Sequence, residues 1–198
     1  ICLIWESFKF MSNKKTDHPK GSKKLIGAWA LYDWANSVYS LVISSAIFPI
    51  YYSQYVFSQT NSVEILNLDI NKDTLISSVS AISFLLIAFL SPLLSGIADF
   101  IGNKKIFMKF FVYMGSLSCI GLYWFELETI EISLLFYTLG LIGFWGSLVY
   151  YNSYLTDITY PNQTNKVSAK GYTMGYVGSV ILLLINLIMI NFYETFGF

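Results

Sequence analysis

Long uncharged stretches are the feature that most restricts how this chain folds. Thr74–Ala98, Ile132–Thr156 and Gly171–Tyr193 contain no charged residue, and each exceeds the roughly 18 apolar residues that indicate a membrane span. Charged residues make up only 12% of the chain, whereas a soluble domain carries about 25%. The mean hydropathy of +0.57 points the same way. The sequence therefore predicts a polytopic membrane protein of the all-α class, built as a bundle of transmembrane helices.

The apolar stretches and the loops between them predict five spans. These cover about residues 25–55, 74–98, 106–125, 131–155 and 170–192. Residues 1–24 are predicted to form a cytoplasmic tail, and residues 25–198 the transmembrane domain. Pro49 predicts a kink near the end of the first span. In the last span, Gly171, Gly175 and Gly178 are predicted to allow close packing against another helix.

Both ends of the chain are irregular. The first methionine is Met11, and the sequence "MSNKKTDHPKGSKK" that begins there is typical of a cytoplasmic tail. We expect Met11 to be the true start and residues 1–10 to be an artefact of gene calling. The chain stops at Phe198, soon after the last apolar stretch. We therefore expect it to be an N-terminal fragment of a longer protein.

Lysines are distributed unevenly between the loops, and this predicts the orientation. The tail and the loops on its side of the membrane carry most of them: Lys14, Lys15, Lys20, Lys23, Lys24, Lys104, Lys105, Lys109, Lys166 and Lys170. The opposite loops carry one lysine and six acids: Lys72, Glu64, Asp69, Asp73, Glu126, Glu128 and Glu131. Because an excess of lysine marks the cytoplasmic side, the N-terminus is predicted to be inside. We expect a multi-pass protein of the cell membrane.

Asp33 is a carboxylate placed inside the first predicted span. Residues three, four and seven positions apart share one face of a helix, so Asn36, Ser37 and Ser40 lie on the face of Asp33. Ionisable residues within spans usually face a bundle interior or a water-filled cavity. Asp33, Asn36, Ser37 and Ser40 are therefore predicted to line a substrate or proton pathway. The alternative is a structural acid, at the cytoplasmic interface or paired with a lysine.

A second candidate feature is the turn after the second predicted span, "SPLLSGIADFIGNKK" at residues 91–105. It contains Asp99, then Gly102 where the chain reverses, then Lys104 and Lys105. Asp99 stands where a carboxylate can meet lysines or a helix N-terminus. The plainer interpretation is a basic cytoplasmic turn with no further role.

"SGIADFIGNKK" resembles the loop between the second and third helices of the major facilitator superfamily of secondary transporters. Ala98, Asp99, Gly102 and Lys104 match its usual pattern, whereas Phe100 and Asn103 replace usual basic residues. Three further stretches, in the right order, resemble the vacuole-effluxer-like branch. They are "YDWANSVYS" (32–40), "YYNSYLTDI" (150–158) and "NKVSAKGYTMGYVGS" (165–179).

The resemblance implies five of the six helices of an N-terminal half, and a missing C-terminal half as partner. It implies a secondary active transporter of a small solute, with amino acids first among the candidates. In such transporters the two halves rock about a central site. Asp99, Gly102, Lys104 and Lys105 would then form a cytoplasmic gate, with Asp157 as a latch to the lysines. The plainer interpretation of Asp157 is an ordinary interfacial acid, because exposed ion pairs contribute little.

Other functions are less well supported by the residues. A membrane enzyme needs clustered catalytic groups, and the one histidine, His18, lies in the tail. Cys2 and Cys119 are far apart and form no metal-binding pattern. We therefore expect no enzyme activity, no metal, no cofactor and no nucleic-acid partner. The expected partners are the lipid bilayer, a small solute and a candidate coupling proton. A non-transporting membrane assembly or sensor protein remains the alternative function.

Overall fold

A computed structural model describes residues 19–65, 67–101 and 103–196, with the side chains of Asp99 and Ile101 excepted. Residues 1–18, which form most of the predicted tail, lie outside the described residues. The chain divides into two compact units. The first comprises residues 1–49 and 153–198, and the second residues 50–152. Helices α3 and α6 each run through a boundary between units.

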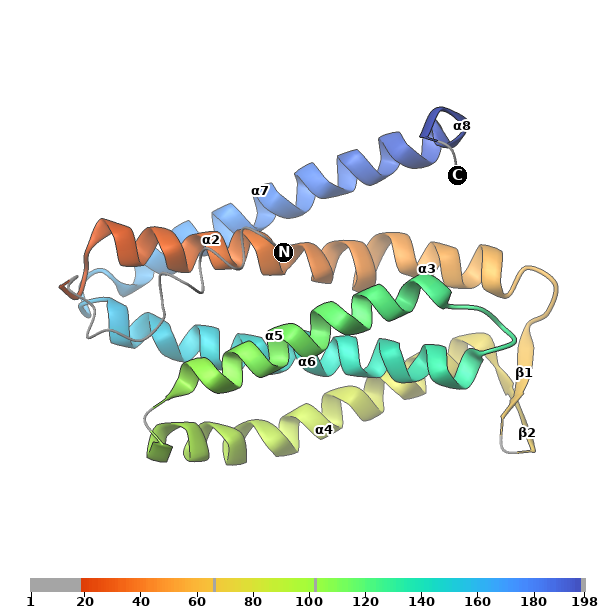
Figure 1. Cartoon of the computed structure of the whole chain (residues 1–198), viewed down its shortest axis with the longest axis horizontal. Coiled ribbons are helices and arrows are strands. Elements are labelled where there is room, and N and C mark those ends of the chain that lie inside the picture. The colour runs from red at the N-terminus through yellow and green to blue at the C-terminus, as the bar shows by residue number, and fades with distance from the viewer. Residues whose placement is uncertain (1–18, 66, 102, 197–198) are drawn as a thin grey trace. The chain divides into compact units, whose positions relative to one another are not determined.

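The first unit is built on two helices, α2 (Lys23–Tyr39) and α7 (Thr164–Asn191). Figure 1 shows α7 beside α2, and the two helices pack along one another. Ser22 caps α2, because its Oγ accepts a hydrogen bond from the backbone N–H of Leu25 at 3.4 Å. The unit also holds the end of α6 (Ile130–Ile158) and the short C-terminal α8 (Tyr193–Phe196).

The helical segment that begins with α2 contains two stretches with π-helical hydrogen bonding. A π-helical stretch, η1 (Ser40–Ala46), follows α2, then come α3 (Ile47–Tyr51) and a second π-helical stretch, η2 (Tyr52–Val56). Pro49 lies in α3 and has no N–H to donate to the preceding turn, which disrupts α-helical bonding there. The sequence predicted a kink at Pro49, and what the structure shows around it is this change of hydrogen-bond register.

The second unit contains α4 (Lys72–Ile101), α5 (Lys104–Gly121), the 3₁₀ turn η3 (Leu122–Trp124) and most of α6. Helices α5 and α6 meet closely at Gly115 and Gly143, because neither residue has a side chain between the two backbones. Tyr51 donates a hydrogen bond from its hydroxyl to the carbonyl of Phe125 at 2.9 Å. This bond ties the end of α3 to the turn that follows α5.

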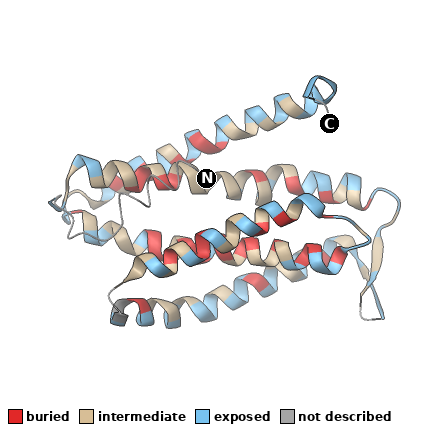
Figure 2. Ribbon diagram, in the orientation of Figure 1, coloured by how far each residue is buried: buried red, intermediate tan, exposed pale blue. Residues whose placement is uncertain are grey.

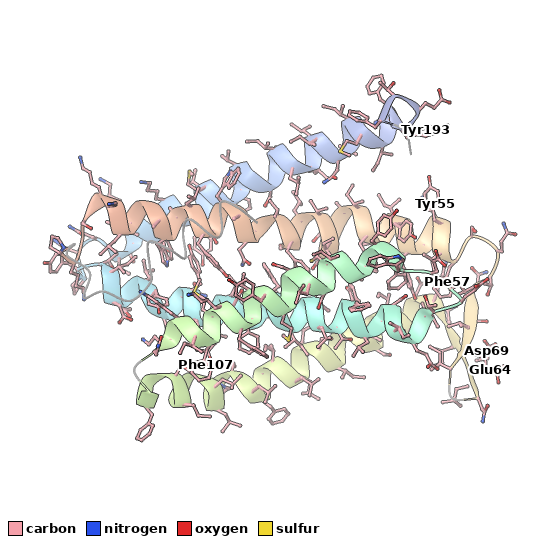
Figure 3. The ribbon with its side chains drawn as sticks, viewed as in Figure 1. Tyr55, Phe57, Glu64, Asp69, Phe107 and Tyr193 are labelled. Atoms are coloured by element: carbon pink, nitrogen blue, oxygen red, sulfur yellow. The ribbon has the colours of Figure 1, made fainter. Side chains whose placement is uncertain are left out.

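The second unit also contains a β-hairpin that the sequence did not predict. Its strands, β1 (Ser62–Ile65) and β2 (Leu68–Asn71), are antiparallel, with Ile65 opposite Leu68. Asn67 adopts a positive φ of 62° in the turn, a conformation that asparagine tolerates well. Glu64 and Asp69 are opposite one another (Figure 3). Facing like charges destabilise a strand pair. The backbone N–H of Lys72 donates a hydrogen bond to the carbonyl of Asn61 at 2.9 Å, directly beyond the pair formed by Ser62 and Asn71.

Four of the described helices are long and apolar enough to cross a membrane. They are Lys72–Ala98, Lys104–Trp124, Ile130–Ile158 and Thr164–Asn191. Exposed residues run along α4 and α7 (Figure 2), and on α7 they include Ile181, Leu184 and Ile188. Soluble proteins rarely expose apolar surface on this scale. The chain is a multi-pass helical membrane protein, as predicted. The fifth span, at residues 25–55, stays a prediction because its helix is interrupted.

Candidate functional site

Asp33 lies on the face of α2 that packs against α7, and it is 3% exposed. One carboxylate oxygen, Oδ1, accepts a hydrogen bond from the hydroxyl of Ser37 at 3.4 Å. The other, Oδ2, is buried and has no hydrogen-bond partner among the described residues. Burying a charge without pairing it costs several kcal/mol or more. A single long hydrogen bond does not offset that cost, so this carboxyl group is suited to take up a proton or a cationic ligand.

Gly175 of α7 forms the surface opposite this carboxylate. A Cβ atom at Gly175 would lie 2.7 Å from Asp33 Oδ2 and 2.6 Å from Ser37 Oγ. Three residues further along α7, a Cβ atom at Gly178 would lie 2.5 Å from the carbonyl oxygen of Trp34. The prediction that these two glycines serve close helix packing is confirmed. Gly175 also sets the space in which the Asp33 carboxylate lies.

Asn36 adds a buried donor beside the buried acceptor. Its side-chain Nδ2 is buried and has no hydrogen-bond partner among the described residues. Because Asn36 lies three positions after Asp33 in α2, both side chains occupy neighbouring positions on one face. We call Asp33, Asn36 and Ser37 the α2 polar cluster. The α2 polar cluster can accept hydrogen bonds through a carboxylate and donate them through an amide.

Ser40 is more exposed than the other three residues. It begins the π-helical stretch η1, and its carbonyl accepts a hydrogen bond from the hydroxyl of Ser45 at 2.9 Å. Its own backbone angles, φ −59° and ψ −43°, are α-helical, so the period of 3.6 residues runs unbroken from Asp33 to Ser40. A π-helix has i→i+5 bonds and therefore more residues in each turn, which changes the period only after Ser40. A role for Ser40 in the pathway stays a prediction.

The predicted cytoplasmic gate is described only in part. The side chain of Asp99 and the whole of Gly102 lie outside the described residues. Lys104 and Lys105 begin α5, whose N-cap residue, Asn103, makes no side-chain capping bond. Asp157 is exposed in the last turn of α6 and belongs to the first unit, whereas both lysines belong to the second. The gate and its latch therefore stay predictions.

Sequence reasoning missed Gly175 as part of the candidate site. Glycine in an apolar span indicates only that some helix approaches closely, and the partner helix becomes known only when α2 and α7 are seen together. Within the described residues there is no group of three or more His, Cys, Asp or Glu side chains that could hold a metal ion.

Comparison with known proteins identifies the family. The model of the family described as "Vacuole effluxer Atg22 like" matches residues 21–196. The chain belongs to the vacuole effluxer Atg22-like family. This confirms the predicted resemblance to that branch of the major facilitator superfamily. The α2 polar cluster and Gly175 both lie within the part of the Atg22-like chain that the family model matches.

A relative of this Atg22-like chain is known in Bacillus subtilis (strain 168). It is named an uncharacterized MFS-type transporter, YxiO, and is 39% identical over 163 residues. The matched part covers 82% of this chain and 37% of the relative. The chain thus spans well under half the length of that relative. No solved structure matches the chain at a significant level.

Proposed function

We propose that the chain is the N-terminal part of a secondary active transporter of a small solute, with amino acids as the first class to test. The α2 polar cluster contacts the solute or carries the coupling proton. The observation that supports this most directly is the buried carboxylate of Asp33, whose Oδ2 has no hydrogen-bond partner among the described residues. Intramembrane ionisable residues are uncommon, and they mark substrate and proton pathways.

The proposal extends to the topology and to the rest of the transporter. The helical segment 23–56 serves as a fifth span, the N-terminus is cytoplasmic, and the protein lies in the cell membrane. The matched part of the chain covers 37% of YxiO, so a full-length transporter supplies further helices. Alternating access arises when the two halves rock about the site between them. Asp99, Gly102, Lys104, Lys105 and Asp157 act at the cytoplasmic gate.

The test is Asp33→Asn in the full-length protein, reconstituted into vesicles. The amide keeps the shape of the carboxyl group, but it can neither bind a proton in the physiological pH range nor form an ion pair with a cation. We expect normal membrane insertion and loss of coupled transport. Glu131→Gln is the matched control, because it removes an exposed carboxylate at the start of α6. Transport by Asp33→Asn at the wild-type rate across the pH range would refute the proposal.

Two measurements separate the two roles of Asp33. If it carries the proton, Asp33→Asn loses accumulation driven by a pH gradient but keeps solute exchange between equal compartments. If it contacts the solute, both activities are lost. Gly175→Ala provides an independent check, since its Cβ would displace the carboxylate oxygen at 2.7 Å. We expect Gly175→Ala to reduce transport, and Gly27→Ala to leave it unchanged because no atom lies within 4 Å of a Cβ there.

A further inference from the structure

The four residues Pro19–Ser22, which we call the strap, fasten the start of α2 to the end of α6. Ser22 donates a backbone hydrogen bond to Pro19 at 3.1 Å, which closes the strap into a turn. Gly21 donates a backbone hydrogen bond to the carbonyl of Ile158 at 2.7 Å. Its φ of +81° lies in the left-handed region, and a Cβ there would be 2.9 Å from Gln163 Oε1. Glycine is therefore the residue best suited to this position.

The turn that receives the strap is itself held by side-chain hydrogen bonds. The hydroxyl of Thr159 donates to the carbonyl of Leu155 at 2.6 Å and lies 3.0 Å from the hydroxyl of Thr164. Gln163 donates a backbone bond to Tyr160 at 2.9 Å. The strap and the turn between α6 and α7 thus fix the start of α2 beside the start of α7. All these residues belong to the first unit.

This junction gathers lysines from two parts of the chain that are far apart in sequence. We call them the basic patch: Lys20, Lys23, Lys24, Lys166 and Lys170, all of them exposed. Among the described residues at this end of the unit, Asp157 is the acid on the surface. Lys24 directly precedes the apolar first segment, and Lys170 directly precedes the uncharged stretch Gly171–Tyr193. In the topology proposed above, on which this step rests, the basic patch lies at the level where a bilayer presents its head groups.

We propose that the basic patch binds the phosphate-bearing head groups of anionic phospholipids. The positive-inside rule explains why each segment is rich in lysine, but it does not require the two segments to be fastened together. The strap concentrates their charge at the membrane surface. Each lysine near an anionic surface strengthens attraction by about fivefold. The inference does not depend on transport or on the role of Asp33, since every residue involved is outside the α2 polar cluster.

Lipid bound to the purified full-length protein tests this. We would hold the protein in detergent micelles that contain phosphatidylcholine, add phosphatidylglycerol, and count the retained lipids by native mass spectrometry. We expect a preference for phosphatidylglycerol that falls roughly 30-fold in Lys166→Gln/Lys170→Gln, given about fivefold for each lysine. Lys72→Gln/Lys109→Gln, which removes two lysines from the second unit, should keep the preference.

Gly21→Ala tests the role of the strap without changing the charge of the basic patch. It leaves every lysine in place, and we expect it to weaken the preference because the two segments are no longer fastened. The proposal would be overturned if Lys166→Gln/Lys170→Gln and the control Lys72→Gln/Lys109→Gln showed the same preference for phosphatidylglycerol. Competition with inorganic phosphate shows whether the basic patch binds a lipid head group or free phosphate. If it displaces phosphatidylglycerol at equal concentration, the patch is a free-phosphate site and the lipid proposal is wrong.

Discussion

The crossing of α5 and α6 allows an unusually clean test of the packing, because two glycines face each other there. A Cβ atom at Gly143 would lie 2.6 Å from both Cα and N of Gly115 and 2.8 Å from the carbonyl oxygen of Phe111. All three are backbone atoms, so no side-chain rotation can relieve the clash. In contrast, a Cβ atom at Gly115 would find its nearest neighbours, in the backbone of Gly143, at 3.5 Å. That is an ordinary van der Waals contact.

The two Gly→Ala variants therefore isolate the cost of the clash. Each gains the same helix propensity, about 1 kcal/mol for replacing glycine in a helix interior. Only Gly143→Ala must push the backbones apart, from 2.6 Å toward the roughly 3.5 Å at which carbon atoms attract. Overpacking of this kind costs about 1–3 kcal/mol, and rigid neighbours place this site near the upper end. We expect Gly143→Ala to be about 2–3 kcal/mol less stable than Gly115→Ala.

The measurement is equilibrium unfolding of both variants and the wild type in one detergent, followed by tryptophan fluorescence and by resistance to proteolysis. Gly115→Ala should unfold at or slightly above the wild-type midpoint, and Gly143→Ala clearly below it. Equal midpoints for the two variants would show that these glycines do not face one another as described. Gly96→Ala controls for propensity alone, since no atom lies within 4 Å of a Cβ there.

Two further predictions concern topology and the second unit. A cysteine at Ser62 or Glu128 should react with an impermeant thiol reagent added outside the cell, whereas a cysteine at Asn103 should not. Labelling at position 103 from outside would show that the proposed orientation is wrong. Tyr51→Phe should lower the free energy of unfolding by about 0.5–1.5 kcal/mol, because it removes the hydrogen bond to Phe125. Tyr55 is 69% exposed, and Tyr55→Phe should have no measurable effect on the unfolding midpoint.

The fold class was predictable because a membrane-spanning segment determines its own secondary structure. In lipid each span must satisfy its backbone hydrogen bonds internally, so the uncharged stretches alone indicate α4, α6 and α7. The hairpin β1–β2 was missed because its short strands carry a facing acidic pair that no strand pattern favours. The pairing of α2 with α7 was also beyond sequence reasoning. Several spans contain small residues, and nothing in one sequence states which glycine meets which helix.

In the candidate site, too, only the arrangement of residues within one helix was predictable from the sequence. Asp33, Asn36 and Ser37 follow one α-helical turn, and the structure places the first and third in hydrogen-bond contact. The role of Ser40 stays a prediction, and the π-helical bonding that begins at this residue could not be predicted from the sequence. Gly175, which contacts both Asp33 and Ser37, comes from the other end of the sequence. Its role becomes visible only in the packed first unit.

The charged residues at the helix ends allow the helix dipole to be compared with the membrane surface as the cause of their distribution. A helix dipole favours acids at the N-terminus and lysines at the C-terminus, by about 0.3–1 kcal/mol each. Yet α2 and α5 begin with lysines and have no acid in the first turn, and neither has a basic residue in the last turn. Helices α4 and α6 have the acids Asp73 and Glu131 in their first turns, although α4 begins with Lys72. A rule based on the dipole alone would treat all four helices alike.

The sign of the charge instead alternates with the predicted side of the membrane. An anionic surface attracts each lysine by about 1 kcal/mol, which is enough to offset the effect of the helix dipole. This alternation is the strongest physical argument for the proposed N-in orientation.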